Sequence, residues 1–441
     1  MNERKIYSSR VWLDQKLQPA TLGFRDGKIT SIDNQHLPES EDFGDAVIMP
    51  GVLDVHVHVN EPGRTLWEGF DTATQAAAAG GTTTIIDMPL NASPVTTSAA
   101  AFQQKLAATA GKMHVHVGFY AGLVPGNAHE LPALFEMGVV GVKCFLTHSG
   151  IDEFPNVTEA DLEEAMPIIA RYGIPLLAHC ELYDQEEDCG FDSHPTSYQH
   201  YLASRPKKWE NDAIALMIRM CRKHNCPVHI VHVASAEALA MIQAAKAEGL
   251  PITAETCTQY IYFSAEEIPD GNCVYKCAPP IREKANNEQL KYALKTNVLN
   301  FLATDHSPAP PEIKEMNSGN LKKAWGGIAG IQFLLNASWT AVKDEFSLDE
   351  FIPLLTSEPA RFLSNQNKGN LAVGADADIV IWQPEQAQTI QEEDILFRHK
   401  ISPYIGQKLY GVVQETIVNG ATVYKKQTIE HKNQGKWLLK K

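Results

Sequence analysis

The chain has 441 residues, 44% of them hydrophobic, and its 53 acidic residues outnumber its 38 Lys and Arg residues, so that the formal net charge is -15 at pH 7. This length and hydrophobic content support one large folded domain, or a large one with a small one. The acidic balance argues against a polyanionic partner, and we expect neither nucleic acid nor an acidic membrane surface to bind.

Three further features indicate where the protein works. Its eight cysteines include no Cys-x-x-Cys pair, and residues 1–5 lack the apolar core of a secretory signal. No apolar run approaches the roughly 20 residues that a membrane span requires. We therefore expect a reduced, cytoplasmic protein.

Both ends of the chain are rich in strand and turn patterns. Short strands are expected at 5–8, 18–24 and 28–32, and Asp26-Gly27 is typical of a tight hairpin turn. Strands at 374–382 and 415–424 follow the same pattern, with Asn419-Gly420 as a second turn. Because the two ends share this character and the middle does not, we predict a small β-sandwich domain built from residues 1–49 and 370–441.

Residues 50–369 alternate between strands and helices, which favours a parallel sheet. Strands are expected at 52–59, 83–89, 114–123, 141–147, 174–181, 227–234, 252–258 and 301–306, and clear helices at 67–80, 94–111, 158–173, 209–225 and 235–249. Eight such units suit an α/β fold with a TIM-like (β/α)8 barrel, which typically takes about 250 residues. A doubly wound open sheet is the alternative, but no Gly-x-Gly-x-x-Gly follows a strand to mark a dinucleotide site.

Side chains that can bind metal end five of these strands. His56 and His58 lie two positions apart in the first strand, so both imidazoles face one side and can reach one ion. Since the carboxyl ends of barrel strands meet over a single mouth, residues from the other strand ends are expected there too. They are Lys143, His179, His232 and Asp305.

The lysine determines how this group is interpreted. A lysine beside cations loses its proton, and the neutral amine can take up carbon dioxide to become N6-carboxylysine, whose carbamate bridges two metals. We expect His56, His58 and Asp305 on one metal, His179 and His232 on the other, and carboxylated Lys143 on both. Ions about 3.5–4 Å apart would hold a bridging hydroxide as the nucleophile of a hydrolysis. Asp305 would be the catalytic residue that takes its proton and passes it to the leaving nitrogen.

Other histidines are given no ligand role. His114 and His116 repeat the His-x-His spacing, but no ligand-like strand ending accompanies them. His229 lies three positions before His232 and is expected on the opposite face of the strand. His194, His200 and His306 are expected in loops or behind the ligands.

Six segments resemble the cyclic amidohydrolases of the amidohydrolase superfamily, and the resemblance spans essentially the whole chain. They are 50–70 (PGVLDVHVHVNEPGRTLWEGF), 87–91 (DMPLN), 143–150 (KCFLTHSG), 277–282 (CAPPIR), 305–308 (DHSP) and 325–330 (WGGIAG). The resemblance implies a metal-bound barrel with a flanking β-domain, a carboxylated lysine and a homotetramer. The reaction it implies is hydrolytic opening of a hydantoin ring, that of allantoin, to allantoate in purine degradation.

Substrate choice within this group depends on a few positions. Dihydroorotases carry an arginine where this chain has Asn60, and that arginine pairs with the substrate carboxylate. A neutral amide suits an uncharged ureido ring better, because an unpaired carboxylate is costly to desolvate. Dihydropyrimidinases and hydantoinases have a tyrosine at the position of His148, which is here either an oxyanion donor or a residue that orders its loop.

The resemblance also implies contacts of the ring with backbone groups near Ala278 and Gly327. Arg64 and Asn91 are further candidates for substrate binding, with surface or turn roles as the alternative. One departure is Thr258-Gln259, where related sequences usually have Pro-His. The missing histidine is not a ligand in that pattern, so the expected metal centre is unaffected.

Two alternatives stay open. One is a dihydroorotase or a hydantoinase of the dihydropyrimidinase type. The other is an inactive homologue that acts as an assembly partner, which predicts that ligands are lost, whereas all six are present. Zinc is the expected metal, and cobalt, iron, manganese and nickel also tolerate these ligands.

Overall fold

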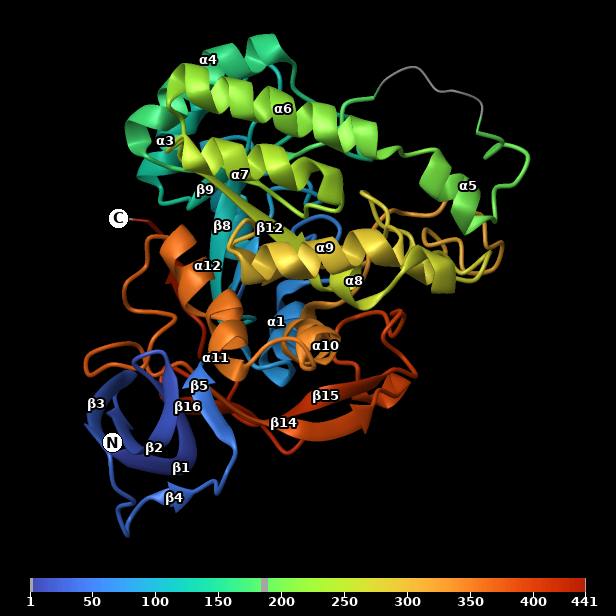
Figure 1. Ribbon diagram of the computed structural model, residues 1–441. Coiled ribbons are helices and arrows are strands. Elements are labelled where there is room, and N and C mark those ends of the chain that lie inside the picture. The colour runs from blue at the N-terminus through green and yellow to red at the C-terminus, as the bar shows by residue number, and fades with distance from the viewer. Residues whose placement is uncertain (1–2, 184–188, 441) are drawn as a thin grey trace.

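The computed structural model describes residues 3–183 and 189–440 and contains two nine-stranded sheets (Figure 1). The first is a mixed sheet made from the two ends of the chain, in the order β17-β16-β15-β14-β5-β1-β2-β3, with β4 beside β1. Its strands are β1 Arg4–Leu13, β2 Lys16–Arg25, β3 Lys28–Asp33, β4 Glu41–Asp42, β5 Val47–Pro50, β14 Ile379–Thr389, β15 Lys408–Val418, β16 Ala421–Lys425 and β17 Thr428–Ile429.

Both predicted hairpin turns are present in this sheet. Asp26 and Gly27 join β2 to β3, and Asn419 and Gly420 join β15 to β16, each with positive φ. Two consecutive left-handed residues are what a tight hairpin of this kind requires. The two chain ends meet where β5 pairs with β14 in antiparallel register. The domain boundaries at 49/50 and 369/370 stay a prediction.

The second sheet is the predicted barrel. Its strands pair in parallel in chain order from β6 to β13, and each overlaps a predicted strand. They are β6 Val52–Val57, β7 Thr82–Asp87, β8 His116–Gly122, β9 Gly141–Phe145, β10 Leu176–His179, β11 Val228–Ile230, β12 Ile252–Cys257 and β13 Phe301–Ala303. The barrel closes where the backbone N–H of His58 donates to the carbonyl of His306 (2.8 Å) and that of Thr304 donates to Asp54 (3.2 Å).

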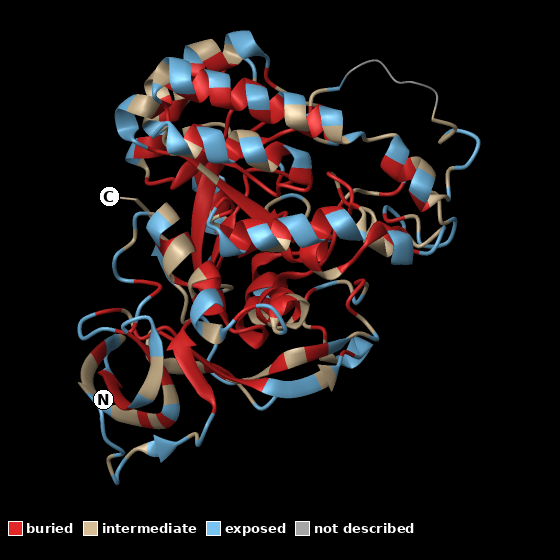
Figure 2. Ribbon diagram, viewed as in Figure 1, coloured by how far each residue is buried: buried red, intermediate tan, exposed pale blue. Residues whose placement is uncertain are grey.

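Helices surround the barrel and turn their apolar faces inward (Figures 1 and 2). The five predicted helices correspond to α1, α2, α4, α6 and α7, and the capping box between Thr158 and Asp161 begins α4 as its sequence indicates. The helices are α1 Phe70–Ala79, α2 Ala99–Ala108, α3 Leu131–Glu136, α4 Glu159–Tyr172, α5 Tyr198–Ala203, α6 Lys207–His224, α7 Leu239–Ala247, α8 Thr258–Tyr262, α9 Lys284–Lys295, α10 Leu334–Val342, α11 Leu348–Phe351 and α12 Ser357–Phe362.

The last described residues join the barrel sheet. Strand β18, Trp437–Leu438, pairs in parallel with the start of β8. The indole N–H of Trp437 donates to the hydroxyl of Thr109 (2.8 Å), and the backbone N–H of Gly435 donates to the carbonyl of Met113 (3.0 Å). The chain end thus leaves the terminal sheet and covers the amino-terminal side of β8.

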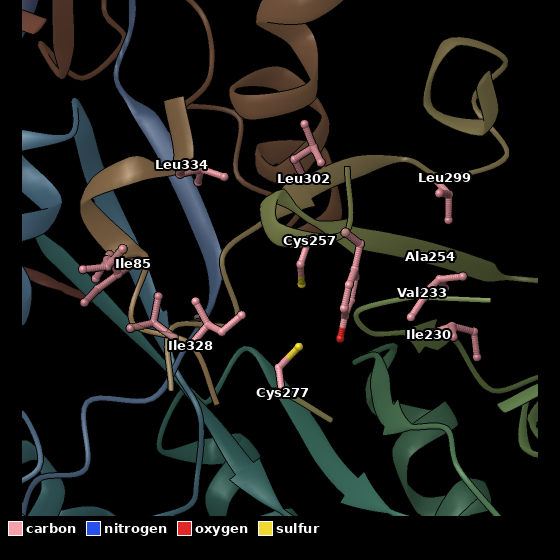
Figure 3. Packing of buried hydrophobic residues seen from close by; sticks show 14 of the residues in the cluster. Ile85, Ile230, Val233, Ala254, Cys257, Cys277, Leu299, Leu302, Ile328 and Leu334 are labelled. Carbon is pink, nitrogen blue, oxygen red and sulfur yellow. The ribbon is translucent and has the colours of Figure 1, made fainter. Parts of the chain in front are cut away.

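The cysteines, which all lie in the described part of the chain, are thiols and form no disulfide. All eight are free, and Cys257 and Cys277 pack among aliphatic side chains such as Leu302 and Ile328 (Figure 3). Within residues 3–183 and 189–440, no helix has the length and apolar character needed to cross a membrane.

Candidate active site

A cavity of about 820 Å³ opens where the barrel strands end. All six predicted metal ligands line it: His56, His58, Lys143, His179, His232 and Asp305. Each of the six is buried. Residues from five separate strands therefore converge on one cavity, and their role as metal ligands stays a prediction.

Three of these side chains form a cluster suited to a cation. The Nε2 atoms of His56 and His58 lie 3.2 and 3.3 Å from the same oxygen of Asp305, Oδ1, and one ligand atom from each residue lies within 4.8 Å of the others. Behind them, His56 Nδ1 lies 2.6 Å from Glu255 Oε1, and His58 Nδ1 lies 3.0 Å from the carbonyl of Leu90. Since both acceptors require Nδ1–H, each histidine presents the lone pair of Nε2 to the cavity.

The other two histidines face each other across a short gap. His179 Nδ1 lies 2.9 Å from His232 Nε2, and His179 Nε2 lies 2.8 Å from Glu181. Glu181 is also ion-paired with Arg205. Burial by itself would raise the pKa of Glu181. Arg205 and His179 outweigh this effect and lower the pKa well below its usual range. A charged Glu181 accepts Nε2–H, so His179 offers the other ring nitrogen, Nδ1, to the cavity.

Lys143 is buried, and its Nζ has neither a salt bridge nor a hydrogen bond among the described residues. Its Nζ lies 4.9 Å from the centre of the Phe145 ring. Burial lowers the pKa of Lys143 to about 8. A buried amine with a lowered pKa and no partner is the state from which a carbamate can form.

These atoms fit a metal site. His56 Nε2 is, like Lys143 Nζ, a buried polar atom that lacks a hydrogen-bond partner in the described part of the chain. Burial also lowers the pKa values of His56, His179 and His232, which favours the neutral imidazoles that bind metals. Imidazole nitrogens with carboxylate oxygens are a donor set for zinc and similar divalent ions.

The predicted substrate-binding residues divide into two groups. Asn91, His148 and Ala278 line the cavity, whereas Asn60, Arg64 and Gly327 do not. Asn60 is fully buried, and its Oδ1 accepts a hydrogen bond from Asn91 Nδ2 (3.2 Å). Arg64 donates to the backbone carbonyl of Asn91 (2.8 Å). Both therefore support Asn91 from behind.

His148 and Gly327 are held by loop contacts. His148 Nδ1 accepts the backbone N–H of Gly150 (3.1 Å), in the manner of a residue that orders its loop. The N–H of Gly327 donates to the carbonyl of Lys276 (3.0 Å), and its carbonyl accepts the ammonium of Lys314. Contacts of these residues with substrate stay predictions.

The predicted orientation of His229 is wrong. It was expected to face away from the site, but its Nε2 lies 3.2 Å from Glu255, the carboxylate that also holds His56. Alternation fails because β11 ends at Ile230 and His232 adopts a left-handed φ of 39°. The supporting residues Glu181 and Glu255 were also missed, although Glu181 lies two positions after the ligand His179 and Glu255 is an acidic residue within the barrel strand β12.

The other histidines lie elsewhere. His114 pairs with Asp71 (2.9 Å) and His116 with Asp378 (3.2 Å).

Thr258 and Gln259 begin α8 and do not line the cavity, so this departure from related sequences lies behind the site.

The comparisons with known proteins agree with this geometry. The sequence profile of the amidohydrolase family matches residues 47–423, and the chain belongs to that family. The chain is 42% identical to allantoinase from Arabidopsis thaliana over 87% of this chain and 79% of the relative, and 39% identical to allantoinase from Streptomyces avermitilis over 96% and 95%. L-Hydantoinase (dihydropyrimidinase) from Arthrobacter aurescens has a similar structure, with a TM-score of 0.92, 27% identity and 99% coverage of both chains. The amidohydrolase family is metal-dependent, and the cluster of His56, His58 and Asp305 is consistent with that property.

Proposed function

We propose that this protein hydrolyses the hydantoin ring of allantoin to allantoate. The observation that carries the proposal is the convergence of six ligand-type side chains on one cavity at the barrel mouth. The reaction type follows from this donor set, and the choice of substrate is supported by the identity to the two allantoinases over most of their length.

The proposed cofactor is a pair of divalent metal ions, zinc first, with cobalt, iron, manganese or nickel as compatible alternatives. His56, His58 and Asp305 would hold one, His179 and His232 the other, and Lys143, carboxylated on Nζ, would belong to both. When bound, such ions polarise the ring carbonyl and lower the pKa of water.

The protein's own part in the chemistry is to move a proton and orient the ring. Asp305 Oδ1 lies within 3.3 Å of two ligand nitrogens at the cavity wall, where it can accept a proton from the attacking water. A bond forms between the water oxygen and the ring carbonyl carbon, the carbon–nitrogen bond breaks, and Asp305 returns the proton to the leaving nitrogen.

Asn91 supports a neutral substrate. Its Oδ1 is buried and has no partner among the described residues, whereas its Nδ2 donates to Asn60. Asn60 thereby engages the donor end of the amide and leaves its acceptor end for the substrate in our proposal. An acceptor suits the N–H groups of a ureido ring and leaves a substrate carboxylate without a partner, which is costly in a buried site.

The test is one assay of allantoin, dihydroorotate and hydantoin with the zinc-loaded protein. We expect allantoin to be opened with the highest kcat/KM. Efficient opening of dihydroorotate, or of hydantoin, with little turnover of allantoin would favour the other cyclic amidases. A protein that holds no metal after purification with metal present would contradict the hydrolase and favour the inactive assembly partner.

We further propose a cytoplasmic homotetramer, on the basis of the resemblance to the cyclic amidohydrolases. Sedimentation equilibrium of the purified protein tests the assembly, and a monomer at micromolar concentration would contradict it.

A further inference from the structure

Two buried carboxylates hold ligand histidines from behind, and their charges are balanced differently. Glu181, behind His179, is ion-paired with the guanidinium of Arg205. Glu255, behind His56, is fully buried, and its ion pairs within the described residues are with two imidazoles. One belongs to the ligand His56 and the other to His229.

The contacts of His229 define its hydrogen-bonding state. Its ring is fully buried, with Nδ1 2.8 Å from the hydroxyl of Thr253 and Nε2 3.2 Å from Glu255 Oε2. A carboxylate oxygen requires a donor, so Nε2 carries the hydrogen, and the hydroxyl donates to Nδ1. The rings of Phe301 and Phe362, whose centres lie 5.2 and 4.4 Å from that of His229, hold the imidazole in this plane.

We propose that His229 is a positioning residue that acts through Glu255 to fix the tautomer and orientation of His56, and thereby sets the metal affinity of the His56 site. The inference rests on the metal centre proposed above. With both oxygens engaged, by His56 Nδ1 at 2.6 Å and by His229, the carboxylate cannot turn. His56 must then donate through Nδ1 and present Nε2 to the cavity, 3.2 Å from Asp305.

Loss of the His229 donor has a defined consequence. One oxygen of the fully buried Glu255 is left without its His229 donor, and the carboxylate no longer holds His56 in a single orientation. Loss of such an outer partner typically weakens metal binding about 10–100-fold. His179 is held independently through Glu181, so the second site is expected to keep its affinity.

The experiment measures zinc binding by competition with a chromogenic chelator. His229→Phe keeps the aromatic packing and removes the donor, and His229→Gln keeps a donor at the same reach. We expect His229→Phe to weaken one of the two zinc sites roughly 10–100-fold, and His229→Gln to recover most of that loss. The matched control is His116→Phe, another buried barrel histidine paired with a carboxylate, Asp378, and it should leave zinc binding unchanged.

A double-substitution cycle separates positioning from a general structural effect. If His229 acts through Glu255, then His229→Phe adds no further loss in a Glu255→Gln background. Unchanged zinc affinity in His229→Phe, or an equal added loss in the Glu255→Gln background, would overturn the inference. The metal-free unfolding temperature of each variant shows that it is folded. Absence of zinc binding in the unaltered protein would instead overturn the proposed metal centre.

Discussion

At the scale of single residues, Lys143 is the group on which the two-metal proposal depends. It is buried in the cavity wall, and its ammonium has no hydrogen-bond partner in the described part of the chain. An uncompensated buried ammonium is costly, and conversion to a carbamate that bridges two cations removes that cost.

We expect Lys143→Ala to lower the rate of ring opening at least ~100-fold, because the bridging ligand is lost. Acetate or propionate should restore part of the activity, since a small carboxylate can occupy the place of the carbamate. The measurement is the rate of allantoin hydrolysis against acid concentration. Lys105→Ala, which removes a buried lysine paired with Asp87 outside the cavity, is the control and should show no rescue. Full activity of Lys143→Ala would rule out the bridging role.

Asn60, beyond the end of the first barrel strand, lies where strand alternation no longer predicts the direction of a side chain. Asn60 was predicted to bind the substrate, but it does not line the cavity, and its amide contacts Asn91, which does. It adopts a φ of 65°, so the strand alternation that places His56 and His58 does not extend to it. A left-handed residue at a strand end redirects the chain, and the sequence pattern contains no clear sign of it.

At the scale of elements, all eight barrel strands and five helices could be predicted because their signals are local. Apolar runs of strand length alternate with amphipathic segments that have caps, as in α4 with its capping box and its left-handed Gly173. Strand ends were predicted too long. β11 stops at Ile230, four residues before its predicted end, because His232 leaves the sheet with positive φ to enter the site.

Asp378 joins the terminal sheet to the barrel. Its carboxylate accepts hydrogen bonds from Lys368 (2.5 Å), His116 (3.2 Å) and the backbone N–H of Asn419 (2.9 Å). Burial by itself would raise the pKa of Asp378. His116 and Lys368 outweigh this effect and lower the pKa well below its usual range. A lowered folded-state pKa stabilises the protein above the unfolded-state value, and this stabilisation is lost as the pH falls through the folded-state pKa.

We therefore expect Asp378→Asn to reduce the free energy of unfolding by roughly 1–3 kcal/mol at about pH 7, because the buried side chains of Lys368 and His116 lose a hydrogen-bond acceptor. The difference from the unaltered protein should shrink below about pH 4. Urea unfolding of both proteins at about pH 7 and below about pH 4 measures this difference in unfolding free energy. Glu248→Gln, which breaks an exposed surface pair with Arg222, is the control and should cost about 0–1 kcal/mol. A difference that does not change with pH would contradict this account.

The C-terminal strand depends on one glycine. A Cβ placed on Gly435 would lie 1.9 Å from the carbonyl oxygen of Val115, so any side chain there pushes β18 off β8. We expect Gly435→Ala to destabilise the fold by about 1–3 kcal/mol and to speed amide exchange at the start of β8. Hydrogen exchange followed by mass spectrometry measures the second effect. Gln434→Ala, one residue earlier, truncates a half-buried side chain without touching Val115 and should change neither. An unperturbed β8 in Gly435→Ala would contradict the pairing.

At the scale of the whole molecule, the proposed ligands come from five strand ends distributed around the barrel. A ligand that binds only the folded state adds stability in proportion to the logarithm of its concentration over Kd. Metal ions at this position would therefore stabilise the entire barrel as well as enable the chemistry.

We expect removal of metal with a chelator to abolish allantoin hydrolysis and to lower the melting temperature, and added zinc to restore both. At 100 times Kd the gain in unfolding free energy is about 2.7 kcal/mol. Calorimetry over a series of zinc concentrations measures it. His58→Ala should show a smaller zinc-dependent shift, whereas a melting temperature independent of zinc in the unaltered protein would contradict a folded-state metal centre.

The sequence by itself determined the barrel, the terminal sheet and the six side chains that meet at the cavity. It could do so because strand and helix periodicity are local, and because parallel barrel strands bring their carboxyl ends together whatever the loops do. Only the tertiary structure decided which ring nitrogen each histidine presents and that Glu255 links His56 to His229. The physical reason is that a tautomer is set by its hydrogen-bond partner, and those partners lie on strands far apart in the chain.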